Sequence, residues 1–185
     1  MSEIIGWCCS YLHAFKDAQF RNLRPHKPNH EEVWKPPPWG IIKVNVDAAF
    51  PPSKYFYNIS LVSRNSDGQC IWWKIRKVFG QIRPVDGEAN AVLQAITTAR
   101  TLHWRNIIVE GDCVEVIDAL REKTRTFKSF RAVLDECFSL SSFFSVCSFS
   151  FFKRPCNRLA HDLASISVTD YLKESSISSN LAMSA

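Results

Sequence analysis

Hydrophobic and polar residues alternate near position 45 with the two-residue period of a β-strand. In the segment Lys43–Phe50, KVNVDAAF, Val44 and Val46 point to one face of the predicted strand. Asn45 and Asp47 point to the other face, so the strand ends with a carboxylate on its polar side. A solvated strand end explains a lone acid, and a functional role therefore requires other carboxylates close to this one.

Two more strand patterns follow and are separated by a turn sequence. Asn58–Arg64, NISLVSR, and Gln69–Val78, QCIWWKIRKV, are rich in β-branched and aromatic residues. Between them lies Asn65–Gly68, NSDG, which is a strong turn signal. Together with the first segment, they predict a three-stranded antiparallel meander.

The pattern then changes to the period of a helix. Across Gly87–His103 hydrophobic residues recur three or four positions apart, and Ile107–Val109 follows as a short apolar strand of the kind that is buried on both faces. The later elements predicted by the pattern are helices over Cys113–Lys123 and Phe127–Leu140, a strand over Val146–Phe152 and a helix over Asn157–Val168. This order of elements predicts an α/β domain, with helices packed on the faces of a mixed sheet.

These elements divide the chain into three parts. Residues 1–38 are expected to be a weakly structured leader that ends in a stiff proline-rich linker, Pro36–Pro38. Residues 39–168 are expected to form the domain. Residues 169–185 are rich in serine and are expected to be a flexible tail.

Composition and charge describe an ordinary globular protein that is mildly basic. A formal net charge of +5 permits a polyanionic partner without requiring one. The seven cysteines are an odd number without C-x-x-C pairs, so neither a disulfide framework nor a zinc ribbon is indicated, and a reducing compartment fits best. His26 and His30 have the spacing of half a zinc site, but a weakly structured leader is the better interpretation of this region.

The sequence carries no signal for export or for membrane insertion. Its first residues, MSEIIGWCCSYLHAF, place an acid where a secretory signal carries basic residues. The most apolar segment, Cys137–Phe152, is rich in serine and shorter than the roughly 18 residues of a membrane-spanning helix. We therefore expect an intracellular protein, nuclear or cytoplasmic, that is not secreted and has no membrane partner.

Two more acids occupy positions from which they can meet Asp47. Glu88 lies in the first turn of the predicted helix and on its inward stripe. The positive end of a helix favours an acid in the first turn but does not explain one on the buried face. Asp112 follows the central strand and has the spacing of a capping box with Glu115, while strand ends are also where ligands bind in open sheets. Asp112 can therefore cap the following helix, bind a ligand at the strand end, or do both.

The three acids converge if the first strand lies parallel to Ile107–Val109. Carboxylates 4 Å apart repel one another by about 4 kcal/mol at an effective dielectric of about 20, so a cluster of Asp47, Glu88 and Asp112 requires a cation. Oxygen ligands select Mg²⁺ or Mn²⁺ over zinc, and two such ions about 3.5–4 Å apart are a standard device for phosphodiester cleavage. The acids therefore predict a site for two Mg²⁺ or Mn²⁺ ions.

Five ordered segments carry a resemblance to a known family. They are PPPWGIIKVNVDAAF, SRNSDGQC, DGEANAVLQAITTA, NIIVEGDCVEVIDAL and FFKRPCNRLAHDLA. From Trp39 to Val168 the chain resembles the plant type 1 ribonuclease H domain, in its reverse-transcriptase-like form related to non-LTR retroelements. The resemblance implies a ribonuclease H-like fold, in which helices flank a five-stranded mixed sheet made of an antiparallel meander plus two parallel strands. It also implies endonucleolytic cleavage of the RNA strand of RNA–DNA hybrids with two divalent ions.

The resemblance assigns site residues to this chain. Asp47, Glu88 and Asp112 match the family's catalytic, metal-binding acids. The register places His161 at the family's fourth acid position and favours it as the fourth catalytic residue. Asp162 is the alternative, as a metal ligand, because helical geometry places it nearer the apolar face of its helix.

The chain departs from the family pattern in two further places. After Asp47 the sequence AAFPPSKYFYNISL replaces a glycine-rich turn, and ahead of Arg154 the residue Phe151 stands where a histidine is common. Both departures concern substrate handling rather than the fold. Two functions from different classes therefore stay open: an endonuclease that cleaves RNA in hybrids, and a nucleic-acid-binding module of retroelement origin whose catalysis is weakened or lost.

The expected partner is an RNA–DNA hybrid or another nucleic acid, recognised mainly by shape. The densest basic stretch, REKTRTFKSFR, is either a track for a phosphate backbone or a solvated basic loop. It contains Arg121, Lys123, Arg125, Lys128 and Arg131. Trp72 and Trp73 are adjacent in a predicted strand and face opposite ways, so at least one belongs in the core and the other is available to stack on a sugar or a base. We expect the protein to be a monomer.

Overall fold

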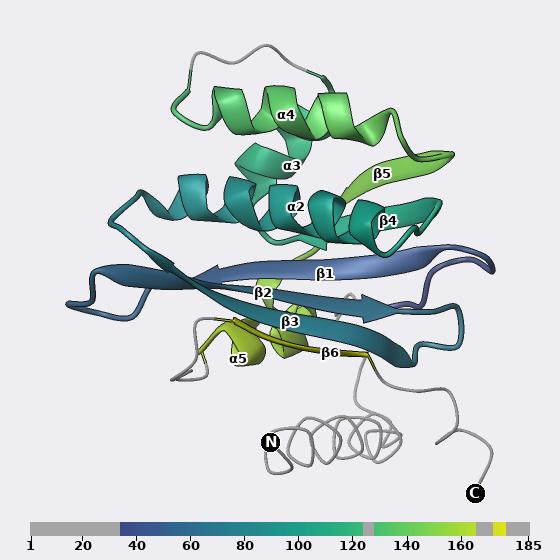
Figure 1. Cartoon of the computed structure of the whole chain (residues 1–185), viewed down its shortest axis with the longest axis horizontal. Helices are drawn as coiled ribbons and strands as arrows, with labels where there is room; N and C mark the ends of the chain where they lie inside the picture. Colours follow the sequence, from purple (N-terminus) through teal and green to yellow (C-terminus); the bar gives the residue numbers. More distant parts are fainter. Residues whose placement is uncertain (1–33, 124–127, 166–171, 177–185) are drawn as a thin grey trace, which may run out of the picture. The chain divides into compact units, whose positions relative to one another are not determined.

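The computed structural model describes residues 34–123, 128–165 and 172–176 of the chain (Figure 1). All of them belong to one of two compact units, Glu32–Ala185. Residues 1–33 of the predicted leader, including the His26 and His30 pair, lie outside the described residues. The same holds for Arg125 of the basic stretch.

The described residues form the predicted elements, with small shifts at their ends. The first elements are β1 (Ile42–Ala49), β2 (Phe56–Arg64), β3 (Cys70–Phe79), α2 (Pro84–Thr101) and β4 (Asn106–Gly111). They are followed by α3 (Val114–Arg121), α4 (Arg131–Ser141), β5 (Val146–Phe151), the short 3-10 helix η1 (Arg154–Cys156), α5 (Arg158–Ser165) and β6 (Leu172–Ser176).

The strands form one mixed sheet in the order β5-β4-β1-β2-β3-β6. β1, β2 and β3 pair antiparallel, which confirms the predicted meander, and β4 and β5 extend the sheet beyond β1 as parallel strands. The register pairs Asn45 of β1 with Glu110 of β4. Asp47 and Asp112 each follow two residues later, so both acids reach the same edge of the sheet.

The sixth strand corrects the sequence prediction, which treats residues 169–185 as a flexible tail. Residues 172–176 form β6, which pairs antiparallel with β3 from Trp72↔Ser176 to Arg76↔Leu172. Composition did not indicate this strand because its sequence, LKESS, is mostly polar. Backbone pairing explains it: the outer edge of β3 offers a row of N–H and C=O groups that any extended segment can satisfy.

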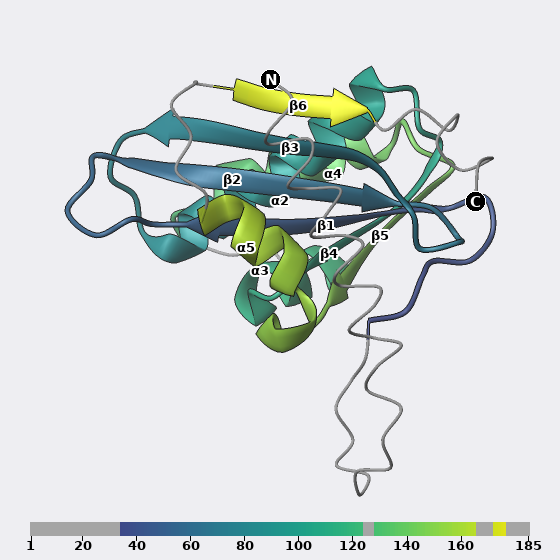
Figure 2. The ribbon, with the colours of Figure 1, turned by 90° about the horizontal axis from the view of Figure 1, so that it is seen from below.

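Helices cover the two faces of the sheet unequally (Figures 1 and 2). α2, α3 and α4 lie on one face, and α5 lies on the other across β1 and β2. The inward stripe of α2 is buried as predicted, with Val92, Ala95 and Ile96 each at most 2% exposed. Within the described residues, no helix is long and apolar enough to cross a membrane.

Both tryptophans of β3 are buried. Trp72 is 6% exposed and packs edge-on against Trp104, with ring centroids 6.2 Å apart, and Trp73 is 5% exposed on the opposite face. The prediction that at least one is in the core is therefore confirmed. The role of the other as a stacking platform is wrong, because the two faces of β3 are both covered near these residues.

The face beneath α5 is unusually polar, and its side chains anchor that helix. Asn157 donates from Nδ2 to the carbonyl of Val46 at 2.7 Å, just ahead of α5. Ser60 donates to the carbonyl of Ala160 at 2.6 Å, and Asn58 donates to that of Ala164 at 3.0 Å. Three hydrogen bonds from buried side chains thus fix the position of α5 over β1 and β2, which hydrophobic contact alone would leave free to slide.

We predict that Asn157→Ala lowers the free energy of unfolding by about 1–3 kcal/mol, because it removes a hydrogen bond from a buried site. Urea denaturation followed by circular dichroism measures this. The matched control is Asn106→Ala, since Asn106 also donates from Nδ2 to a backbone carbonyl, that of Gly40 at 3.2 Å, but at an exposed site. Equal losses in the two variants would contradict the anchoring role of Asn157.

Candidate metal centre

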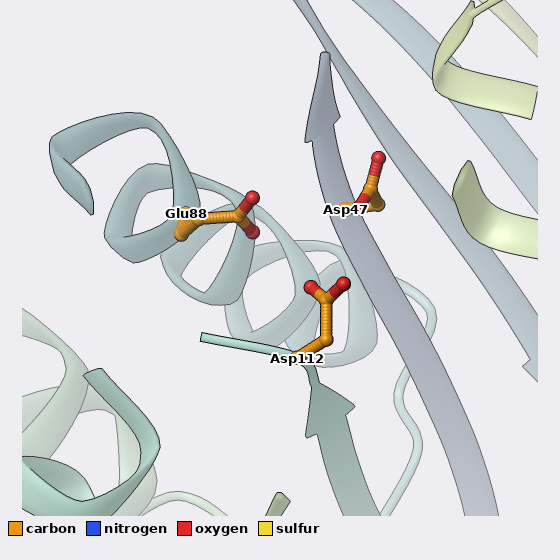
Figure 3. Close-up of side chains that lie close together, drawn as sticks. All are labelled: Asp47, Glu88 and Asp112. Carbon is orange, nitrogen blue, oxygen red and sulfur yellow. The ribbon is translucent and has the colours of Figure 1, made fainter. Parts of the chain in front are cut away.

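The three predicted acids come together in the folded chain. Ligand oxygens of Asp47, Glu88 and Asp112 all lie within 4.8 Å of one another. Figure 3 shows their side chains around a common space, contributed by β1, by the start of α2 and by the residue that follows β4. The convergence expected from parallel strand ends is therefore observed.

Asp112 owes its position to the end of β4 and not to a helix cap. α3 begins at Val114, its N-cap is Cys113, and no side chain caps it. The capping box predicted for Asp112 and Glu115 is therefore wrong: the helix starts one residue too late for Asp112 to reach its backbone N–H groups as N-cap. The carboxylate is turned instead toward the other two acids (Figure 3).

Glu88 reaches the site because α2 approaches the β1–β2 hairpin closely at Gly87. A Cβ atom at Gly87 would lie 2.3 Å from Cζ of Phe50, so only glycine fits without displacing that ring. Phe50 in turn stacks on Tyr57, with centroids 5.3 Å apart. The bulky segment after Asp47, which departs from a glycine-rich turn, thus packs against a glycine on the helix.

Burial and mutual repulsion raise the pKa values of two of the acids. The pKa of Glu88 rises to about 9, chiefly through burial and then through the charges of Asp47 and Asp112. The pKa of Asp47, which is 2% exposed, rises to about 6 through burial and the charge of Asp112, partly offset by His161 and Arg154. Because burial and repulsion disfavour the ionised forms of these two carboxylates, they gain most from a bound cation.

His161 occupies the fourth position of the site. Its Nδ1 lies 3.2 Å from Oδ2 of Asp47, and the side chain of Arg154 lies 3.3 Å from the same ring nitrogen. Asp162 forms an ion pair with Arg158 on its own helix, with Nε and Oδ2 3.6 Å apart, and is not among the acids that the described residues bring together. Of the two residues considered from the sequence, His161 is the one that contacts the acids.

Arg154 was not identified as a site residue from the sequence. It opens η1, where Pro155 follows it, and its charge lowers the pKa values of both Asp47 and Glu88. Its only sequence signal is its place in a basic, proline-containing turn ahead of α5. Such turns are common, so position in the fold is what reveals this arginine.

The basic stretch after α3 lies largely in ion pairs with nearby acids. Nζ of Lys128 lies 2.8 Å from Glu115. The two other described pairs are Arg121 with Asp118 at 3.8 Å and Arg131 with Asp135 at 3.6 Å. Because these ion pairs are exposed to solvent, they weaken the electrostatic field of the basic stretch without fixing its side chains in place.

The donor set fits a hard divalent cation. It consists of three carboxylates in a partly buried site, and the raised pKa values of Asp47 and Glu88 reflect a shortage of positive charge there. Oxygen ligands of this kind suit Mg²⁺ and Mn²⁺. An imidazole beside them adds a nitrogen ligand that Mn²⁺ accepts more readily than Mg²⁺.

We predict that the metal-free protein loses stability as pH rises toward 9. The pKa of Glu88 is 4.5 in the unfolded chain and about 9 in the folded protein. Between these pH values the folded state therefore holds a proton that the unfolded chain has released. This contribution is complete below pH 4.5 and is lost as pH rises through the folded pKa. Thermal unfolding in EDTA across this range measures it.

In that experiment Glu88→Gln should flatten the pH dependence, whereas Glu136→Gln, an exposed glutamate on α4, should keep the wild-type slope. Mn²⁺ should raise the melting temperature most at high pH, because it binds the ionised cluster of the folded state. An unchanged slope in Glu88→Gln would show that Glu88 is not the titrating group.

Comparison with known proteins agrees with this architecture. Ribonuclease H1 from Halobacterium salinarum shares 20% identity at a TM-score of 0.61, with 67% of this chain and 94% of that chain covered. An N-terminal ribonuclease H domain from Mycobacterium tuberculosis shares 14% identity at a TM-score of 0.60, with 67% and 90% covered. A ribonuclease H1 isolated from compost, solved with an RNA/DNA hybrid, shares 12% identity at a TM-score of 0.59, with 66% and 92% covered.

These likenesses confirm the predicted ribonuclease H-like fold, with β3-β2-β1-β4-β5 as its shared sheet. A search of curated proteins found no match. A family model described as reverse transcriptase-like matches residues 45–167, which span all three acids and His161. Since that match covers well over half of the sequence, the chain belongs to the reverse transcriptase-like family.

Proposed function

We propose that this protein is a metal-dependent endonuclease that cleaves the RNA strand of RNA–DNA hybrids. The observation that carries the proposal is the meeting of Asp47, Glu88 and Asp112 within 4.8 Å at the carboxyl edge of the sheet. Membership in the reverse transcriptase-like family and the ribonuclease H-like fold support it. The compost ribonuclease H1 solved with an RNA/DNA hybrid supports the substrate class.

The side chains have separate roles in this proposal. Asp47, Glu88 and Asp112 would hold two Mg²⁺ or Mn²⁺ ions, and Glu88 would release its proton on binding them. The ions would ready a water for attack and stabilise the leaving oxygen. His161 completes the ligand set from α5, and the positive charge of Arg154 helps to keep Asp47 ionised.

The hybrid would be recognised by its shape, through phosphates and 2′-hydroxyls along the minor groove. The exposed lysines and arginines after α3 favour contact with phosphates through long-range attraction. We further propose a type 1 enzyme of plant retroelement origin, on the ordered motifs of the sequence, that acts as a monomer. An intracellular site of action, nuclear or cytoplasmic, is supported by the odd number of cysteines and the lack of C-x-x-C pairs in the sequence.

We predict that Asp47→Asn lowers the rate of hybrid cleavage by more than about 100-fold, because even residues outside the first ligand shell affect metal binding or activity by about 10–100-fold. A labelled RNA–DNA hybrid incubated with Mg²⁺ or Mn²⁺ measures this. The matched control is Asp162→Asn, which should stay within about fivefold of wild type, because an exposed ion pair contributes about 1 kcal/mol or less. Cleavage that survives Asp47→Asn would rule out the proposed centre, and hybrid binding without any cleavage would favour a binding module.

We predict that His161→Asp raises the affinity for Mg²⁺ by about tenfold or more, since an added charge at 4 Å interacts by about 4 kcal/mol at an effective dielectric of about 20. Isothermal titration calorimetry measures the affinity directly. His161→Asn, which is similar in size but neutral, should give no such gain. Equal affinities in the two variants would show that residue 161 lies outside the ligand sphere.

A further inference from the structure

Two adjoining hollows lie beside β5, and apart from Arg121 and Lys123 of the basic stretch their lining residues have no role in the proposed hydrolysis. The larger, of about 670 Å³, lies between α3, α4 and β5 and includes Leu120, Arg121, Lys123, Phe138, Phe144 and Phe149 in its lining. The smaller, of about 220 Å³, is lined by Arg100, His103, Trp104, Arg105, Phe143 and Phe144. Because Phe144 lines both, the two hollows adjoin each other, and together they are here called the β5 groove.

The smaller hollow of the β5 groove is well separated from the acids. Glu88 lies near the start of α2 and Arg100 lies twelve residues later on the same helix, which corresponds to about 18 Å along its axis. α4 lies alongside α2, and a hydrogen bond between Ser129 and Asp86 joins the beginnings of the two helices. The ends of both helices therefore lie toward the β5 groove and away from the metal centre.

The ionisable side chains of Lys, Arg and His type that line the β5 groove give it a basic surface. Its lining includes three arginines, a lysine and a histidine, and none of its lining residues is acidic. Asp118 lies 3.8 Å from Arg121, but this contact is exposed and exposed pairs of this kind contribute little. The ligand that best complements this lining is therefore an anion with several charges.

The aromatic rings of the β5 groove are placed for stacking. Phe143 is 53% exposed, although it is a large hydrophobic side chain, and the guanidinium of Arg100 lies 4.2 Å from its ring centroid. Phe138, Phe144 and Phe149 line the larger hollow at half-buried positions, where one part of each side chain packs against the core and the rest is accessible. Flat apolar surfaces between cations suit a ligand that alternates planar rings with negative charges.

We propose that the β5 groove binds single-stranded nucleic acid. A single strand presents unpaired bases for stacking together with one phosphate per nucleotide, which is the combination that aromatic and basic grooves recognise. A duplex keeps its bases stacked inside, and an acidic peptide has charge without the planar rings. The β5 groove therefore holds an unpaired stretch of RNA or DNA at a distance from the metal centre.

The test measures binding of a labelled oligouridylate and a labelled oligothymidylate of about 12 nucleotides, within the site sizes of known single-strand binders. Fluorescence anisotropy is followed in EDTA with the Asp47→Asn protein, so no cleavage occurs and the outcome does not depend on the proposed hydrolysis. Phe143→Ala should weaken binding by about fivefold or more, since stacking on one base is worth about 1–3 kcal/mol. Arg105→Gln and Arg121→Gln should each reduce the slope of log K against log salt by about 0.7.

The matched control is Lys77→Gln, which removes one positive charge from β3. Three strands separate β3 from β5 in the sheet. This variant should leave both affinity and salt slope unchanged. Circular dichroism and melting curves show whether the variants keep the fold. The proposal is overturned if folded variants of the β5 groove bind like their parent, or if oligoglutamate displaces the oligonucleotides as well as an unlabelled oligonucleotide of equal charge.

Discussion

Mutual repulsion among three partly buried carboxylates is the constraint on which the site depends. The parallel pairing of β1 with β4 forces Asp47 and Asp112 to one edge, and the close approach of α2 at Gly87 adds Glu88. The chain supplies Arg154 and His161 nearby, but together they offset only part of the rise in the pKa of Asp47. The fold thus holds its acids in an arrangement that is costly without a bound cation, which is a sound physical reason to regard the cluster as functional.

The polar face of the sheet explains how His161 is placed. Residues of β1 and β2 that point away from the main core would normally meet solvent or a second apolar layer. Here Asn58 and Ser60 donate to carbonyls of α5 itself, and Asn157 ties the start of that helix to β1. Hydrogen bonds have stricter geometry than apolar contacts, so they fix the register of α5, which turns His161 toward Asp47 and leaves Asp162 beside Arg158.

The sequence was sufficient for the features that depend on local period. Alternation along β1 and the inward stripe of α2 identified Asp47 and Glu88, and the end of a short apolar strand identified Asp112. The features that the sequence did not predict depend on contacts between distant residues. The hydrogen bonds under α5 join positions about a hundred residues apart, β6 forms through backbone pairing that its polar side chains do not signal, and Arg154 acquires a role only because η1 lies against the site.

The strand β6 has a consequence for where this domain ends. The family match stops at residue 167, and β6 begins at residue 172, so a fragment cut to the family boundary would leave the long outer edge of β3 bare. The five residues Trp72–Arg76 would lose their backbone partners and form a template on which a second molecule can add a strand of its own. The short segment beyond the family match thus replaces part of that edge with a strand that carries a lysine and a glutamate, and charged edge residues of this kind oppose sheet-to-sheet polymerisation.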